Sequence, residues 1–328
     1  VVCEVLVETA RLFLNAGHML GGRFCIDGVT GPDEYTCIVD NNYYTNAGAA
    51  YTFFNAAALC GELERLGGFE ALSKKTDVTW AELSDFEAAG ENMYLPYDET
   101  LGICEQDDSF LKKKRWNIGD IPPDMFPLLL HYHPLYINRH QICKQADTVL
   151  AHFIFREEPS LTMARTYCYY EKITTHDSSL SACVYSIMAA RLGDLERAMR
   201  YFQMTVGVDM QDRSGNTRDG LHVANMGGAY LSVVAGFGGL RISQEGTSLF
   251  PLLPAGWSGY SFPLMVKGGR VLVSVDSEGC TLRLLQGSSA KMTVYNRSML
   301  VTKQEVCIRR TVRGVIFDLD GVVTDTAK

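Results

Sequence analysis

The chain has 328 residues, with 30 Lys and Arg against 38 Asp and Glu, which gives a formal net charge of −8. Because acidic proteins repel phosphate backbones and anionic headgroups, this balance argues against nucleic acid or a membrane as the main partner. A hydrophobic fraction of 47% excludes an intrinsically disordered chain, and the length suffices for about two domains. The best apolar run, 227–240, is shorter than the ~18 residues that cross a bilayer.

In chain order, apolar residues recur at helical spacing over about the first 240 positions. The predicted helices cover 3–19, 42–66, 79–89, 138–155, 178–191, 194–207 and 223–237. The second should end at Gly67-Gly68, since glycine commonly terminates helices. The polar stretches 21–41, 96–122, 156–177 and 208–222 are predicted to be long loops, and loops of that length usually carry function.

Beyond position 245 the pattern changes to short alternating runs at 250–254, 261–266, 270–275, 281–285 and 291–294, separated by glycine-containing turns. These runs predict a small antiparallel β domain. We therefore assign 1–244 to a helical region and 245–308 to the β domain. Because the chain starts with Val1 inside an apparent helix and stops abruptly at Lys328, we also expect a segment of a longer protein.

The ten cysteines are scattered and form no Cys-x-x-Cys pair. Several, such as Cys60, Cys143 and Cys183, lie in apolar patterns where a free thiol behaves as a small hydrophobic group. This usage indicates a reducing compartment, so we expect a cytoplasmic protein. His131 and His133 lack matching ligands nearby, and we predict no metal in the helical region.

The segment Gly31-Pro-Asp-Glu-Tyr35 precedes the predicted helix at 42. Gly-Pro favours a turn, and paired acids on a loop above a helix start can face a cleft. Glu34 could protonate a leaving oxygen if burial kept it protonated. The alternative is that Asp33 and Glu34 only cap a turn.

Two further clusters accompany predicted helices. Lys144 and Asp147 are three apart, which predicts either a surface ion pair or, for Lys144 with Gln145, hydrogen bonds to a hydroxyl-rich substrate. Downstream, Asp177 or Ser178 is predicted to be the N-cap of the helix at 178–191.

The last cluster runs from Asp219 into an apolar helix and contains His222, Asn225, Gly227 and Gly228. Exposed backbone N–H groups and the helix dipole favour an anion at such an entrance, and His222 and Asn225 could add donors. This arrangement predicts a phosphate cradle. Close helix packing at the two glycines is the competing interpretation.

Together these clusters resemble the inverting α-glucoside phosphorylases of glycoside hydrolase family 65, which include maltose, trehalose, nigerose and kojibiose phosphorylases. The matching stretches are 31–35, 40–42, 144–147, 176–181, 222–228 and 236–241, and the resemblance covers about 1–300. Stretches 106–111 and 139–141 are more similar to the kojibiose and nigerose branch than to the maltose branch. Asn225 stands where maltose-type members more often carry Ser.

The resemblance implies that inorganic phosphate cleaves an α-glucosyl disaccharide with inversion, giving β-D-glucose 1-phosphate and a free sugar without a cofactor. Glu34 would be the general acid, and Lys144, Gln145 and Glu171 would hold the glucosyl ring. The phosphate would be bound by His222, Asn225, Gly227 and Gly228. Because phosphate is already an anionic nucleophile, the second carboxylate of an inverting hydrolase can be omitted. A hydrolase on the same fold, or a non-catalytic helical scaffold, are the rival hypotheses.

For the fold, the resemblance implies a mainly α chain: the later part of an (α/α)6 barrel followed by a small antiparallel β-sandwich domain. Members of the family are commonly dimers, so a homodimer is a partner to test. Because the early barrel helices would lie outside the chain, we expect the segment alone to be inactive and to expose apolar barrel surface.

The final stretch, 315–324, has the pattern of a buried strand that ends with Asp318 and Asp320. It resembles the first motif of haloacid-dehalogenase-type phosphotransferases, and most closely β-phosphoglucomutase. This resemblance implies that 309–328 begins a truncated α/β domain, with Asp318 as nucleophile, Asp320 as acid/base and Mg²⁺ as cofactor if that domain is complete. A fused mutase would convert β-glucose 1-phosphate to glucose 6-phosphate.

Overall fold

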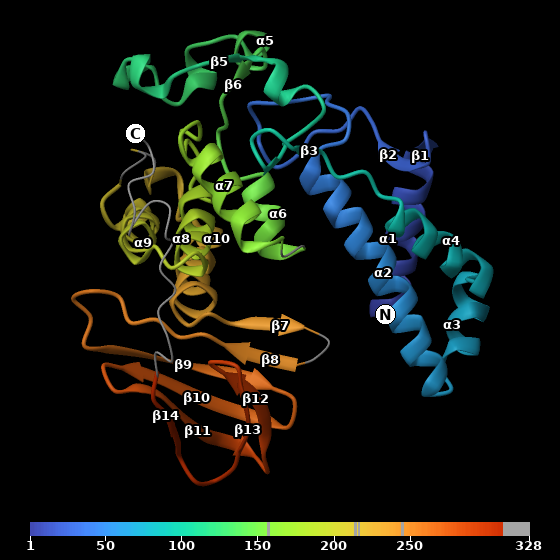
Figure 1. Cartoon of the computed structure of the whole chain (residues 1–328), viewed down its shortest axis with the longest axis vertical. Helices are drawn as coiled ribbons and strands as arrows, with labels where there is room; N and C mark the ends of the chain where they lie inside the picture. The colour runs from blue at the N-terminus through green and yellow to red at the C-terminus, as the bar shows by residue number, and fades with distance from the viewer. Residues whose placement is uncertain (156–157, 213–214, 216, 244–245, 311–328) are drawn as a thin grey trace, which may run out of the picture. The chain divides into compact units, whose positions relative to one another are not determined.

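The computed structural model describes residues 1–155, 158–212, 215, 217–243 and 246–310. The chain divides into two compact units, Val1–Ser232 and a second that starts at Val233. The first is built of helices and the second of strands (Figure 1). Among the described residues, no helix combines the length and apolar character that a membrane span requires.

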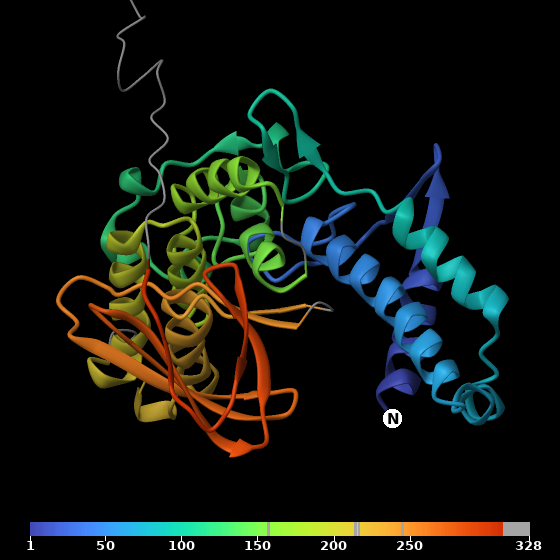
Figure 2. The ribbon, with the colours of Figure 1, turned by 60° about the horizontal axis from the view of Figure 1, so that its bottom comes forward.

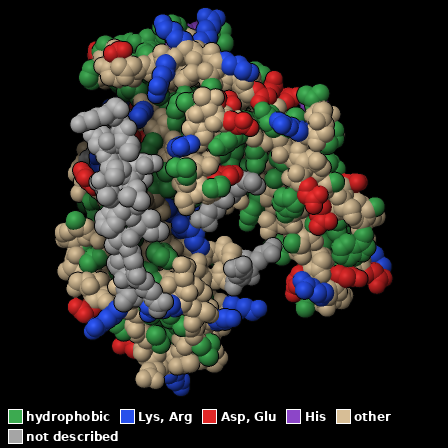
Figure 3. All heavy atoms as spheres, in the orientation of Figure 1, with side chains coloured by type: hydrophobic (Ala, Val, Ile, Leu, Met, Phe, Trp, Pro, Cys, Tyr) green, Lys and Arg blue, Asp and Glu red, His purple; other side chains and the backbone are tan. Residues whose placement is uncertain are grey.

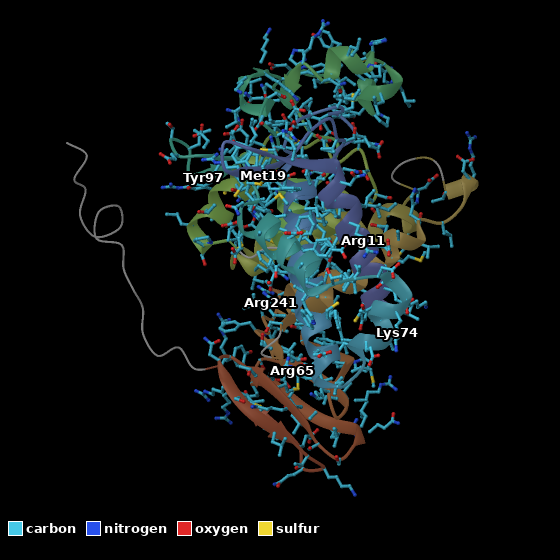
Figure 4. The ribbon with its side chains drawn as sticks, turned by 90° about the vertical axis from the view of Figure 1, so that its right-hand side faces the viewer. Arg11, Met19, Arg65, Lys74, Tyr97 and Arg241 are labelled. Carbon is cyan, nitrogen blue, oxygen red and sulfur yellow. The ribbon has the colours of Figure 1, made fainter. Side chains whose placement is uncertain are left out.

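The first part of the helical unit is a packed group of four helices. It contains α1 (Val2–Ala16), α2 (Tyr43–Arg65), α3 (Phe69–Thr76) and α4 (Trp80–Glu91), with the hairpin β1 (Gly17–Leu20) and β2 (Arg23–Ile26) after α1. Phe53 and Phe86 stack in its core beside Phe24. Arg11 on α1 pairs with Glu82 on α4 at 2.6 Å (Figure 4 labels Arg11, and Lys74 on α3).

The long helix α2 confirms its prediction at both ends. Asn42 caps it, because its side-chain oxygen accepts the backbone N–H of Thr45 at 2.9 Å. The helix stops at Leu66, and Gly67 follows with a φ of 73°, which glycine adopts without strain. Since α2 contacts α1, α3, α4 and α6, it joins the first helices to the later ones.

The later helices are α6 (Thr148–Ile154), α7 (Ser160–Glu171), α8 (Ser181–Arg191), α9 (Leu195–Met210) and α10 (Val223–Leu231), which continues as a π-helix over Ser232–Phe237. Helix α8 is buried along almost its whole length and contacts α6, α7, α9 and α10. A helix buried on all faces belongs at the centre of its unit.

Three predictions in this region are wrong. The stretch 156–177 is not a loop, because it contains α7. The helix predicted over 138–155 begins only at Thr148. Helix α8 starts at Ser181 behind Leu180, without a side-chain cap, so neither Asp177 nor Ser178 is its N-cap.

Short elements connect α4 to α6 and pass over the helix ends. They are β3 (Tyr97–Asp98), β4 (Ile103–Cys104), β5 (Lys114–Arg115), α5 (Pro134–Ile137), β6 (His140–Gln141) and single 3-10 turns at Phe110–Lys112, Ile118–Asp120, Pro123–Met125 and Leu128–Leu130. Another 3-10 turn, Thr217–Asp219, precedes α10. The visible face carries both basic and acidic side chains (Figure 3).

The second unit is a sandwich of two four-stranded sheets around one core (Figure 2). One sheet is antiparallel, in the order β14 (Val306–Ile308), β11 (Gly279–Gly287), β10 (Gly269–Asp276), β9 (Gly259–Val266). The other has the order β13 (Arg297–Val301), β12 (Ala290–Val294), β8 (Gly246–Leu249), β7 (Arg241–Ser243), and its β8–β12 pair is parallel.

The β prediction is confirmed for four of the five runs, since β9, β10, β11 and β12 cover them. The run 250–254 forms no strand. Because Arg241–Ser243 pairs with β8, these residues belong to the sheet rather than to the helical region. Asp318 and Asp320, with the whole motif at 315–324, lie outside the described residues.

Candidate functional site

Asp33 is the buried anchor of the loop that carries Glu34. Its side chain is completely buried, and its Oδ1 accepts the backbone N–H groups of Tyr35 at 3.2 Å and Lys144 at 2.7 Å. Its Oδ2 accepts the Gln106 amide at 2.9 Å. Burial raises the pKa of Asp33 to about 6, although these hydrogen bonds oppose the rise.

Glu34, the next residue, is exposed where Asp33 is buried, and it forms an ion pair with Lys144. The Nζ of Lys144 lies 2.6 Å from Glu34 Oε2. The Lys144 side chain is 17% exposed and the Glu34 side chain is 55% exposed. The burial expected for Glu34 is therefore absent from the described chain. Of the two alternatives for Lys144, the ion pair with Asp147 is wrong, because Lys144 precedes α6 and Asp147 is buried.

Asp147 closes the same network from the start of α6. It accepts the Asn42 amide at 3.1 and 3.3 Å and the backbone N–H of Asp33 at 3.2 Å. Burial, and secondly the charge of Asp33, raise the pKa of Asp147 to about 8. A Cβ at Gly31 would collide with the Asp147 carboxylate and the Asn42 amide, so only glycine fits there.

Gln145 adds a further link, because its side-chain amide donates to the carbonyl oxygen of Pro32. Lys144 and Gln145 therefore both contact the 31–35 loop, from which they are separated by more than a hundred positions. The structure thus brings together the predicted acid and two of the three predicted sugar-binding residues.

Tyr35 ties this loop to two other segments. Its hydroxyl donates to Asp177 Oδ2 at 2.5 Å and accepts the backbone N–H of Leu128 at 3.0 Å. This contact, rather than helix capping, occupies Asp177. Sequence reasoning missed the anchoring roles of Asn42, Gln106 and Asp177, although all three lie in stretches that carried the family resemblance.

Glu171, the third predicted sugar-binding residue, has different partners. It lies at the end of α7, and its Oε1 accepts Arg200 Nη2 at 2.8 Å and the Tyr201 hydroxyl at 3.0 Å. Arg197 Nε approaches the same oxygen at 3.9 Å. With a side chain only 14% exposed, Glu171 is held by α9.

The predicted phosphate residues surround the start of α10. His222 is its N-cap residue, and Asp209 of α9 accepts both the ring Nδ1 at 2.6 Å and the backbone N–H at 3.0 Å. The hydrogen bond from His222 lowers the pKa of Asp209. The buried Asn225 donates to the Thr205 carbonyl at 2.8 Å, and its Oδ1 has no hydrogen-bond partner among the described residues.

Gly227 and Gly228 lie one turn further along α10. Because a helix leaves only its first four N–H groups without an intrahelical acceptor, these two glycines come after the free donors. A Cβ on Gly228 would come within 2.7 Å of Cys183 Sγ on α8, whereas one on Gly227 would meet nothing within 4 Å. Close packing therefore accounts for Gly228, and Gly227 faces open space.

This arrangement offers two kinds of chemistry on one helical unit. An accessible carboxylate held by an ammonium group can exchange a proton with a bound oxygen. The start of a helix beside a histidine can bind an anion. Within the described ranges, no group of three His, Cys, Asp or Glu side chains is placed to hold a metal ion.

Comparisons with known proteins agree with the motifs. An α,α-trehalose phosphorylase of Geobacillus stearothermophilus is 50% identical over 92% of this chain and 40% of its own length. One from Thermoanaerobacter brockii is 40% identical over 93% and 40%. A solved structure named "Putative kojibiose phosphorylase from human microbiome" matches with a TM-score of 0.85 and 27% identity, covering 96% of this chain and 46% of that one.

The higher identity to trehalose phosphorylases does not favour the expected kojibiose and nigerose branch. The chain spans about 40% of the length of these curated relatives. Residues 1–231 match the glycosyl hydrolase family 65 central catalytic domain, and residues 240–301 match the C-terminal domain of the same family. The chain therefore belongs to glycosyl hydrolase family 65.

Proposed function

We propose that this chain contributes the acid and the phosphate site of an inverting phosphorylase that acts on an α-glucosyl disaccharide, with α,α-trehalose as the first candidate. The observation that carries the proposal is the 2.6 Å contact between Glu34 and Lys144 on a loop fixed by buried polar groups. The two relatives named α,α-trehalose phosphorylase support the choice of substrate. In the whole protein the helical unit would form the later part of an (α/α)6 barrel.

In the proposed reaction, Glu34 donates its proton to the glycosidic oxygen as the bond to the anomeric carbon breaks. A phosphate oxygen attacks that carbon from the opposite face, so the products are β-D-glucose 1-phosphate and the free sugar. Proton donation leaves a carboxylate on Glu34, and the Lys144 ammonium at 2.6 Å stabilises that charge. Lys144, Gln145 and Glu171 remain the proposed contacts to the glucosyl ring.

The phosphate would bind at the start of α10, where the helix dipole favours an anion. The Asp209 carboxylate is hydrogen-bonded to Nδ1 of His222, so Nε2 is the ring atom that would contact the phosphate. Asn225 and Gly227 remain the other proposed members of the cradle, Gly227 through the open space beside it rather than through a free N–H, and Gly228 brings α10 close to α8. Phosphate is a co-substrate here, and no cofactor is required.

The test uses the full-length protein with α,α-trehalose, kojibiose, nigerose and maltose, each with and without phosphate. We expect phosphate-dependent release of β-D-glucose 1-phosphate. In Glu34→Gln the rate of this release should fall on the order of 10²–10⁴-fold. Turnover without phosphate would identify a hydrolase instead. Full activity in Glu34→Gln would mean that Glu34 only caps a turn and is not the acid.

The comparisons add no support for a fused phosphoglucomutase, and their family matches end at residue 301. Asp318, Asp320 and the Mg²⁺ that they would bind therefore form no part of this proposal.

A further inference from the structure

We propose that Asp33 is a positioning residue that holds Lys144 by its backbone, so that the Lys144 ammonium group meets the carboxylate of Glu34. This inference rests on the proposed function and assigns a task to Asp33, a fully buried residue to which that function gives none. Asp33 and Glu34 are consecutive, and they hold Lys144 at its two ends. The backbone N–H of Lys144 donates to Asp33 Oδ1 at 2.7 Å, and its Nζ donates to Glu34 Oε2 at 2.6 Å.

The position of Lys144 in the chain explains why it needs this anchor. It follows β6 and precedes α6, so its N–H lies outside both elements and would otherwise lack a regular partner. Lysine side chains are long and flexible, so the ammonium is placed only as well as the backbone that carries it. The carboxylate of Asp33 supplies that fixed point.

Asp33 reaches the same segment by a second route. Its Oδ2 accepts the Gln106 amide, and Gln106 Oε1 accepts the thiol of Cys143 at 3.2 Å, one residue before Lys144. Asp33 is itself fixed, because its N–H donates to Asp147. A buried carboxylate is unfavourable unless donors surround it, and here three donors converge on one side chain. That arrangement exceeds what a simple turn requires.

The test compares two leaving groups in the full-length enzyme. A disaccharide needs a proton from Glu34 to release the sugar, whereas α-D-glucosyl fluoride releases fluoride with little protonation as phosphate attacks the same carbon. If Asp33 positions the acid and its lysine, Asp33→Asn should lower kcat on the disaccharide on the order of 10²-fold. It should lower kcat on the fluoride less than about tenfold. Equal losses on both substrates would overturn the proposal.

A double variant that moves the carboxylate from position 33 to position 106 separates loss of the anchor from a folding defect. In Asp33→Asn the new amide nitrogen must face either the Gln106 amide or the backbone N–H of Lys144, donor against donor in both cases. Gln106→Glu offers that nitrogen an acceptor and lets the side-chain oxygen at position 33 accept the Lys144 N–H again. We expect D33N/Q106E to regain at least about tenfold of the disaccharide rate over D33N. Failure of this double variant to recover, with a melting temperature equal to that of wild type, would also overturn the proposal.

The matched control is Asp194→Asn, since Asp194 also accepts a backbone N–H, that of Arg197 at 3.0 Å, but as the N-cap of α9. Asp194→Asn should change kcat on the two substrates by the same factor. If the wild-type enzyme releases no glucose 1-phosphate from any disaccharide, the proposed function fails. If wild type is active and D33N slows both substrates alike, only the positioning role fails.

Discussion

His222 and Asp209 are joined twice: the ring Nδ1 of His222 lies 2.6 Å from one carboxylate oxygen of Asp209, and its backbone N–H donates to the other at 3.0 Å. One side chain from the last turn of α9 thus fixes both the entry of the chain into α10 and the orientation of the imidazole. A carboxylate bound at Nδ1 fixes the orientation of the ring and leaves Nε2 as the ring nitrogen that can contact a ligand.

The first prediction concerns this pair. Asp209→Asn replaces a charge-assisted bond by a neutral one, so the imidazole should be held less firmly. We expect KM for phosphate to rise by about tenfold in the full-length enzyme, with a smaller change in kcat at saturating phosphate. Initial rates against phosphate concentration measure both. A lower melting temperature with an unchanged KM would restrict Asp209 to a structural role.

The second prediction separates the two glycines of α10. Gly228→Ala places a methyl group against Cys183 and should lower the free energy of unfolding by about 1–3 kcal/mol. Gly227→Ala adds a methyl group in open space within a helix and should raise it by about 0.5–1 kcal/mol. Denaturant unfolding of the two variants measures the contrast.

The same variants test the phosphate cradle. If phosphate binds beside Gly227, the added methyl group should raise KM for phosphate in a variant that is more stable than wild type. An unchanged KM in Gly227→Ala would remove Gly227 from the proposed cradle and leave only the packing role of Gly228. Cys183→Ala combined with Gly228→Ala should recover stability, since the smaller side chain makes room for the methyl group.

The third prediction concerns the hydroxyl of Tyr35. This buried side chain satisfies Asp177 and the N–H of Leu128 at once. Tyr35→Phe leaves both without that partner and should cost about 1–3 kcal/mol in the free energy of unfolding. Tyr51→Phe is the control, because Tyr51 lies 46% exposed on α2 and should change little. Equal effects of the two substitutions would contradict this account.

The elements that local sequence determines were predictable. Helix α2 was expected at nearly its observed bounds, because its cap at Asn42 and its stop at Gly67 are both local signals. Helix α7 was missed, since its buried face is made of Met163, Thr166, Tyr167 and Tyr170 rather than aliphatic residues. A search for aliphatic periodicity does not detect such a face.

The candidate site shows the same limit. Its residue types were identified from motifs, but their partners were not. An ion pair of Lys144 with Asp147 was one alternative, on the assumption of a helix that in fact starts after both, whereas its partner Glu34 lies 110 positions away. The pairing of the Asp33 N–H with Asp147 spans 114 positions. Contacts at such separations depend on how the helices pack, which no local pattern encodes.

The last prediction is a dependence of stability on pH through Asp147. Burial raises its pKa from 3.8 to about 8, so between these values the folded state keeps a proton that the unfolded state releases. The free energy of unfolding therefore falls as pH rises through this window, by at most about 1.4 kcal/mol per pH unit. The raised pKa of Asp33 also lowers the free energy of unfolding as pH rises, but only up to about pH 6.

Another group opposes this trend at lower pH. Burial lowers the pKa of His176 from 6.5 to about 4, so the unfolded state binds the extra proton in that range and stability rises with pH. Between pH 6.5 and 8 neither His176 nor Asp33 contributes, whereas Asp147 still keeps a proton that the unfolded state has released, so its replacement should reduce the slope. Melting temperatures of wild type should fall more steeply across this interval than those of Asp147→Asn. An equal slope in Asp147→Asn would assign the proton to another group.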